Sequence, residues 1–126
     1  MINFLLVCLG GAIGSGLRYL ITAWSRTHLS PTFPYGTLIV NLLGCFVIAI
    51  IMHVALKTAM SIELRLLLTT GFLGGLTTYS AFNYETTALA QEGAARLAVI
   101  NFAITTSGCL AAGLLGLALA RRLAGA

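Results

Sequence analysis

Charged side chains are scarce in this sequence, and acidic ones are scarcer still. Lys and Arg contribute seven of the 126 residues and Asp and Glu only three, so that 8% of the chain is charged, against about 25% in an ordinary soluble domain. An ordinary soluble domain is therefore excluded. The chain also has no Ser/His/Asp set, no H-E-x-x-H pattern and no nucleotide-binding loop, which argues against an enzyme.

Proline and cysteine are rare as well, with two and three residues. Cys8, Cys45 and Cys109 each lie in an apolar run without metal-ligand spacing, and an odd number cannot form a complete disulfide framework. What the chain has in excess is apolar residues: 59% are hydrophobic and the mean hydropathy is +1.00. That excess excludes a disordered chain and indicates a membrane protein.

Charges and turn residues divide the chain into four apolar runs. The predicted spans cover residues 2–23, 36–56, 62–90 and 97–120. Four spans of about 20 residues use about 80 residues and leave no room for a further domain. We therefore expect an all-α integral membrane protein in which residues 1–126 form a single transmembrane domain. The first run has neither a basic n-region nor an A-x-A-like cleavage site, so we interpret it as a span rather than a signal peptide.

The basic residues are almost evenly divided between the two sides of the predicted bundle. An excess of Lys and Arg near span ends sets the orientation of a membrane protein. One side carries Lys57, Arg65, Arg121 and Arg122, and the other carries Arg18, Arg26 and Arg96. A balance of four to three gives hardly any bias, so we expect insertion in both orientations, which allows an antiparallel homodimer.

Small residues recur at four-residue spacing in the first and fourth runs. The pairs and triplets are Gly10 with Gly14, Ala12 with Gly16, and Gly108 with Ala112 and Gly116. Such spacing lets the backbones of membrane helices approach one another closely. We therefore interpret these residues as packing surfaces.

The third run contains the weakest helix of the chain. Residues 74–80 (GGLTTYS) combine two glycines with two β-branched threonines, and glycine in a helix interior costs about 1 kcal/mol relative to alanine. Two interpretations are compatible with this segment. Either the helix breaks and exposes backbone carbonyls that need protein, ion or water partners, or Gly74 and Gly75 form a close-packing point while Thr77 and Thr78 bond back to their own helix.

Three polar residues are unusual for apolar spans. Asn41 stands within LIVNLL and needs a hydrogen-bond partner, which is either another helix or an aqueous path. Glu85 is either an intramembrane carboxylate, a residue type that marks functional sites, or an interfacial residue near a span end. Arg18 either snorkels to the interface or attracts anions toward a vestibule.

Two further sets of residues share a helical face. Asn101, Thr105 and Cys109 are four residues apart in the fourth run and form one polar stripe. Such a stripe either lines a path or holds helices together by hydrogen bonds. Tyr79 and Phe82 are three residues apart; aromatic side chains usually pack, but their positive ring edges can also face an anion.

Three segments of the sequence together resemble a known family. Residues 10–19 (GGAIGSGLRY), 36–44 (GTLIVNLLG) and 70–85 (TGFLGGLTTYSAFNYE) are similar to three signature segments of the Fluc (CrcB) fluoride channels, in the same order and with the same spacing. The resemblance covers the first three predicted spans. It implies a fluoride-selective channel that exports fluoride passively across the cell inner membrane and relieves fluoride toxicity.

The resemblance also implies an assembly and a site. It implies four transmembrane helices with a break in the third, an antiparallel dual-topology homodimer with two pores, and a sodium ion at the dimer centre. The sodium ligands would be the backbone carbonyls of Gly74 and Thr77 from both subunits. The residues implied for the fluoride pathway are Asn41 as a donor, Phe82 and Tyr79 as paired aromatics, Ser80, Arg18 at the vestibule, and a polar track of Thr37, Glu85, Asn101, Thr105 and Cys109.

One position departs from the family pattern, because Tyr79 stands where Phe is usual. Its ring edge is kept, but the hydroxyl adds a donor and an acceptor. The alternative function is a small multidrug-resistance-type exporter, which is also a dual-topology dimer of four-span chains. Such exporters use a carboxylate in the first helix, and the first run has none. A non-transporting assembly factor would leave Asn41 and residues 74–80 without a common purpose.

Overall fold

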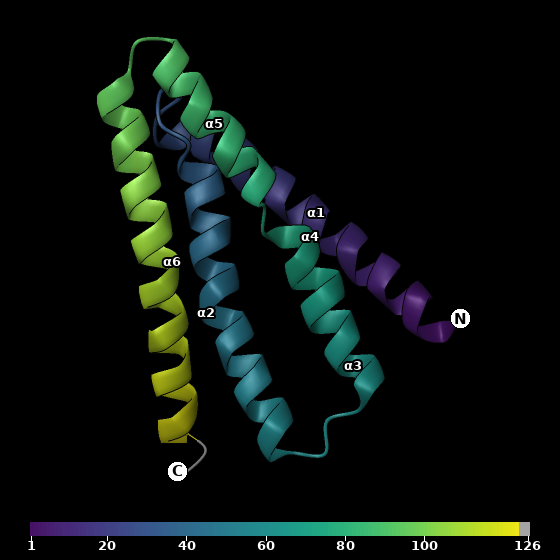
Figure 1. The fold of residues 1–126 in the computed structure, drawn as a ribbon. Helices are drawn as coiled ribbons and strands as arrows, with labels where there is room; N and C mark the ends of the chain where they lie inside the picture. The colour runs from purple at the N-terminus through teal and green to yellow at the C-terminus, as the bar shows by residue number, and fades with distance from the viewer. Residues whose placement is uncertain (124–126) are drawn as a thin grey trace.

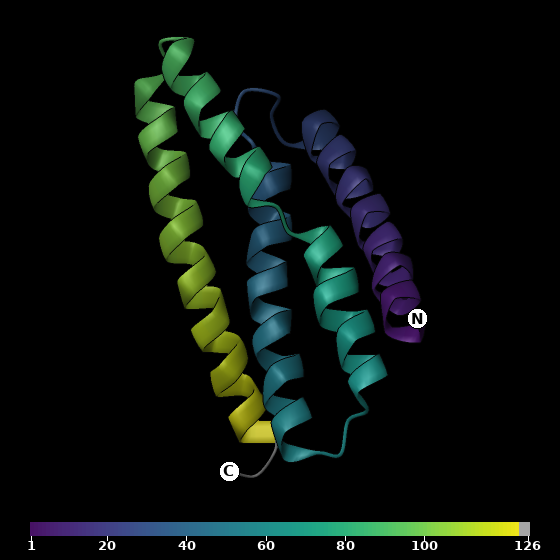
Figure 2. The same ribbon diagram turned by 45° about the vertical axis from the view of Figure 1, so that its right-hand side comes forward.

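The computed structural model of the protein describes residues 1–123 and consists of helices and their connecting loops (Figures 1 and 2). The helices are α1 (Ile2–His28), α2 (Tyr35–Lys57), α3 (Ile62–Leu66), η1 (Leu67–Leu73), α4 (Gly74–Leu76), α5 (Tyr79–Gln91) and α6 (Ala95–Leu123). No strand occurs in residues 1–123. The prediction of an all-helical protein is confirmed.

Three of these helices, α1, α2 and α6, are long and apolar enough to cross a membrane. Large apolar side chains on their outer faces are open to the surroundings, such as Phe4 on α1 and Leu110 on α6, each 68% exposed. The buried core is small and is centred on Val40, Leu73 and Leu76. Helices that are apolar on their outer faces as well as in the core are typical of a protein surrounded by lipid.

The third predicted span is a series of short helices with one interruption. The helices α3, η1 and α4 follow one another without a gap, and η1 is a π-helix, a rare geometry that is frequent at functional sites. Thr77 and Thr78 are then extended, with ψ angles of 156° and 114°. The chain resumes a helical course at Tyr79, the first residue of α5, with a visible bend between α4 and α5 (Figures 1 and 2).

The first half of this broken helix lies very close to α1. A Cβ atom added to Gly14 would collide with the carbonyl oxygen of Phe72, and one added to Gly75 would collide with that of Gly11. Both obstacles are backbone atoms, so neither glycine can be replaced without moving a helix. The two interpretations of residues 74–80 both hold in part, because Gly75 is a close-packing point and the helix ends at Leu76.

The second half of the broken helix turns toward α6, which lies beside α2 (Figure 2). A short turn joins α5 to α6, and Gly93 in that turn has a φ angle of 82°, in the left-handed region that favours glycine. The ends of α1, α2, α5 and α6 that flank the two connecting loops therefore meet at the same end of the bundle (Figure 1).

Candidate functional site

A wide groove with a volume of about 710 Å³ lies beside the helix interruption. Much of its lining is apolar and includes Ile48, Met52, Leu73 and Leu110. The sequence-predicted residues that line it are Asn41, Gly74, Thr77, Tyr79, Phe82, Thr105 and Cys109. The fold therefore brings residues from α2, the broken helix and α6 to one surface.

Asn41 holds the interruption by two hydrogen bonds to one residue. Its Nδ2 donates to the carbonyl oxygen of Thr78 at 3.0 Å, and its Oδ1 accepts from the backbone N–H of Thr78 at 2.8 Å. In a continuous helix that N–H would donate to the carbonyl of Gly74. The Asn41 amide therefore satisfies extended backbone within an apolar region, where free backbone groups are costly. Its nitrogen carries a second N–H that this pair does not use.

The interruption also changes the surroundings of two carbonyl groups predicted as sodium ligands. The carbonyl of Gly74 gives up the partner that a continuous helix would supply, because Asn41 takes that N–H. The carbonyl oxygen of Thr77 lies 3.5 Å from Nη1 of Arg18, which connects α1 to the interruption. Carbonyl oxygens are suitable ligands for a hard cation, and both residues line the groove. Two carbonyl oxygens are fewer than a hard cation requires, and Arg18 places a positive charge beside the carbonyl of Thr77. The donor set therefore fits a sodium ion only if a second copy adds more oxygens.

The two predicted aromatic residues lie side by side on α5 but in different environments. The ring centroids of Tyr79 and Phe82 are 5.4 Å apart. Phe82 is only 4% exposed and also faces Phe102 of α6 at 6.3 Å, whereas Tyr79 is 77% exposed. Phe82 is therefore part of the packing inside one chain, and Tyr79 is open to whatever covers the groove.

Hydroxyl groups organise the start of α5. The side chain of Thr78 accepts a hydrogen bond from the backbone N–H of Ala81 at 3.2 Å and so caps the helix. Ser80 is exposed, and its hydroxyl lies 3.2 Å from that of Thr78. Ser80 is therefore placed next to the interruption, with an exposed hydroxyl whose hydrogen-bond partner is the hydroxyl of Thr78.

The polar stripe of α6 is joined to α5. Asn101 is 1% exposed, and its Nδ2 donates to the hydroxyl of Thr86 at 2.8 Å. The hydroxyl of Thr105 donates to Oδ1 of Asn101 at 3.3 Å. Thr105 and Cys109 also line the groove, so the stripe connects the two helices and reaches the groove at two of its three residues.

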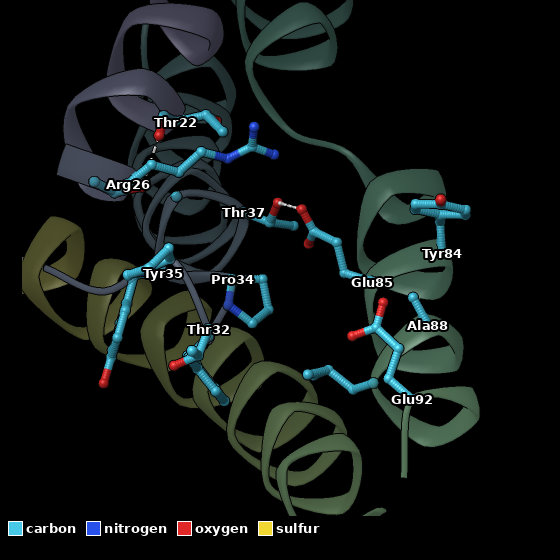
Figure 3. Close-up of a pocket in the computed structure, with 15 residues that line it drawn as sticks. Thr22, Arg26, Thr32, Pro34, Tyr35, Thr37, Tyr84, Glu85, Ala88 and Glu92 are labelled. Atoms are coloured by element: carbon cyan, nitrogen blue, oxygen red, sulfur yellow. Dashed lines mark hydrogen bonds between the residues drawn. The ribbon is translucent and has the colours of Figure 1, made fainter. Parts of the chain in front are cut away.

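Thr37 and Glu85 lie in a second cavity, of about 170 Å³, at the end of the bundle where α1, α2 and α5 meet (Figure 3). The hydroxyl of Thr37 donates to Oε1 of Glu85 at 2.9 Å. The other carboxylate oxygen, Oε2, is buried without a hydrogen-bond partner among the described residues. The predicted track is thus divided between the groove and this cavity.

The part that three residues play in these sites was not predicted from the sequence. Thr78 is held by Asn41, Thr86 is bonded to Asn101, and Arg26 lines the second cavity. Thr78 carried a signal, since it lies in the weak helix of residues 74–80. Thr86 and Arg26 carried none, because their surroundings depend on how distant helices pair.

The sequence model of one protein family matches most of the chain. It is the family described as CrcB-like protein, Camphor Resistance (CrcB), and the match covers residues 5–117. The chain belongs to this family. The predicted family resemblance is thereby confirmed, and the three apolar helices agree with a multi-pass membrane protein.

Curated relatives of this CrcB-like chain extend over almost its whole length. "Fluoride-specific ion channel FluC" of Anaeromyxobacter dehalogenans is 50% identical over 99% of this chain and 100% of its own length. The protein of the same name from Rhizobium etli is 48% identical over 98% of this chain and 99% of its own length. That of Geobacter metallireducens is 44% identical over 98% and 100%. The groove and the second cavity both lie inside the shared region, while the roles of their individual residues stay predictions.

Proposed function

We propose that this protein is a fluoride-specific ion channel that lets fluoride leave the cell passively across the inner membrane and so relieves fluoride toxicity. Full-length relatives at 44–50% identity, each named a fluoride-specific ion channel, support the proposal. The structural observation that carries it is the extended backbone at Thr77 and Thr78, held by Asn41 beside the groove. Non-helical backbone at membrane depth is tolerated where protein buries it or where it lines a water-filled cavity.

The chemistry of the groove is suited to a small anion. Fluoride is strongly hydrated, so a pathway has to replace its water with other donors and still bind it weakly enough for release. The second N–H of Asn41 is such a donor, and the hydroxyl of Ser80, beside the interruption, is another when Thr78 donates to it. The ring edges of Phe82 and Tyr79 add weak positive potential. Several weak contacts of this kind allow passage from one to the next.

The groove also supports an antiparallel homodimer. Exposing its polar residues, among them Asn41 and Thr77, to lipid would cost free energy. A second copy that packs on the groove would remove this cost. The balance of four basic residues against three allows the two copies to insert in opposite orientations. The broken helix from α3 to α5 then supplies a fourth crossing beside α1, α2 and α6.

A sodium ion is proposed as a structural partner at the centre of this dimer. The carbonyls of Gly74 and Thr77 would hold it from each copy, which supplies the additional oxygens that a single chain lacks. When bound, the ion joins the two copies and offsets the charge of nearby fluoride ions. The chain contributes the geometry of these carbonyls through the Asn41–Thr78 pair.

Ion efflux from proteoliposomes tests the function directly. We expect liposomes loaded with potassium fluoride to release fluoride rapidly after a potassium ionophore is added, while liposomes loaded with potassium chloride stay at the background rate. Light scattering on the same protein in detergent should give a protein mass of twice the chain mass of 13.2 kDa. A folded preparation without fluoride efflux would contradict the proposal, and uptake of a cationic drug driven by a pH gradient would favour the exporter instead.

A further inference from the structure

The second cavity is built by the ends of three helices and the loop between α1 and α2 (Figure 3). Gly36 lies against the last turns of α1, since an added Cβ atom would come within 2.7 Å of both Ser25 Oγ and Thr22 Cα. Ser25 is 2% exposed. This contact fixes the last turns of α1 beside the start of α2, and Arg26 is the next residue of α1. Arg26 is therefore held at the cavity by the packing of its own helix.

The charges around this cavity are unequal. Arg26 is the single basic residue among the cavity-lining residues of the described chain, and it faces two acidic ones, Glu85 and Glu92. Figure 3 shows the Arg26 side chain extending over the cavity toward the Thr37–Glu85 hydrogen bond. The guanidinium is thus the one charged group there that attracts an anion. The two carboxylates repel an anion, and they outnumber the guanidinium.

The cavity is placed in line with the groove. On α2, Thr37 lines the cavity and Asn41, four residues later, lines the groove. On α5, Glu85 lines the cavity and Phe82, three residues earlier, lines the groove. Residues three or four apart lie on the same face of a helix. On each of the two helices, a residue of the cavity and a residue of the groove therefore lie on one face, a single turn apart.

We propose that this cavity is an entrance to the fluoride pathway and that Arg26 raises the concentration of fluoride there. The inference rests on the proposed channel function and assigns a role to a residue that the sequence placed only at a span boundary. Clefts lined by charges of one sign change the arrival rate of ions by about tenfold to a thousandfold, and the effect falls with ionic strength. Because this cavity carries two carboxylates beside one guanidinium, Arg26 acts by offsetting part of their repulsion of fluoride. Arg26 acts on entry, so its effect disappears once fluoride saturates the channel.

The test compares Arg26→Gln with Arg96→Gln in proteoliposomes. Arg96 is exposed at the start of α6, at the same end of the bundle, and is not among the residues that line the cavity. Both substitutions remove one positive charge from the same side, so any effect on membrane orientation is matched. At low fluoride and low ionic strength we expect Arg26→Gln to reduce the efflux rate by up to about tenfold, the lower limit for a cleft lined by charges of one sign, and Arg96→Gln to leave it near the wild-type value.

Two further measurements separate steering from a structural role. An impermeant salt should shrink the difference between Arg26→Gln and wild type, because the Debye length falls from about 30 Å at 0.01 M to 3 Å at 1 M ionic strength, and saturating fluoride should abolish it. Arg26→Lys keeps the charge and should keep the rate, whereas Glu92→Gln removes a repelling charge and should raise the rate at low fluoride. These two variants carry the test if Arg26→Gln does not fold.

Different results would contradict the role of Arg26 and the proposed channel function. Equal rates for Arg26→Gln and Arg96→Gln, or a loss that persists at saturating fluoride and high salt, overturn the role of Arg26 while leaving a conducting channel. A Glu92→Gln rate at or below that of wild type at low fluoride overturns it as well. A wild-type protein that does not conduct fluoride overturns the proposed function itself, and the entrance with it.

Discussion

The two halves of the broken helix are held in different ways. The first half, from α3 to α4, packs against α1 through backbone atoms, as at Gly75 against Gly11. The second half, α5, is held by side chains: Thr86 bonds to Asn101, and Phe82 faces Phe102. Backbone contacts allow no extra atom, whereas side-chain contacts can be changed one at a time. We therefore expect substitutions in the first half to affect assembly and those in the second half to affect transport.

The largest effect is expected from Gly75→Ala. The added Cβ atom would collide with the carbonyl oxygen of Gly11, a backbone atom that moves only if α1 moves. Overpacking of this kind costs about 1–3 kcal/mol and occasionally more. We expect a lower melting temperature in detergent and loss of the dimer peak in size-exclusion chromatography.

Gly16→Ala is the matched control for this comparison. Gly16 also lies in a membrane-spanning helix, but an added Cβ atom there would meet nothing within 4 Å. Alanine is favoured over glycine in a helix interior by about 1 kcal/mol, so the melting temperature should stay level or rise. A Gly75→Ala protein as stable as Gly16→Ala would show that the contact between α1 and α4 is looser than the structure indicates.

An intermediate effect is expected from Asn41→Asp, which acts at the junction between the two halves. The carboxylate can still accept the N–H of Thr78, but it loses the N–H that donates to the Thr78 carbonyl and the second N–H offered to fluoride. A negative charge in the groove also repels the anion by about 4 kcal/mol at 4 Å and an effective dielectric constant of 20. We expect fluoride efflux to fall by a hundredfold or more, on the order given by that repulsion, with the dimer still present. Normal efflux would remove Asn41 from the pathway.

Much of the fold could be predicted from composition and local pattern. Apolar runs bounded by charges give helices wherever lipid is the solvent, because only internally bonded backbone is stable there. The weakness of the helix at residues 74–80 could also be predicted, because two glycines and two threonines lower helix stability locally. Asn41 was visible because an amide in an apolar run needs a partner.

The partners of these residues could not be predicted. Nothing in the spacing of Asn41 and Thr78, 37 residues apart, indicates that one clamps the other, because that depends on how α2 and the broken helix pack. The division of the polar track between the groove and the second cavity also depends on helix packing, so it could not be predicted from the sequence. Thr37 and Glu85 fall in one cavity and Phe82 in another, although Phe82 and Glu85 are neighbours on one face of α5.

The smallest effect is expected from Tyr79→Phe, which tests how freely α5 tolerates a change of one atom. Tyr79 is 77% exposed within the chain, and its ring lies against Phe82 through the edge and face rather than the hydroxyl. Removing the hydroxyl keeps the ring edge that can face an anion and removes one donor and one acceptor. We expect the efflux rate to stay within about a few-fold of wild type, since a hydrogen bond is worth about 1 kcal/mol. Tyr19→Phe, on an exposed position of α1 outside both cavities, should change nothing. A tenfold loss in Tyr79→Phe alone would mean that the hydroxyl itself contacts the ion or the second copy, and α5 would then be as intolerant of change as the half of the helix before it.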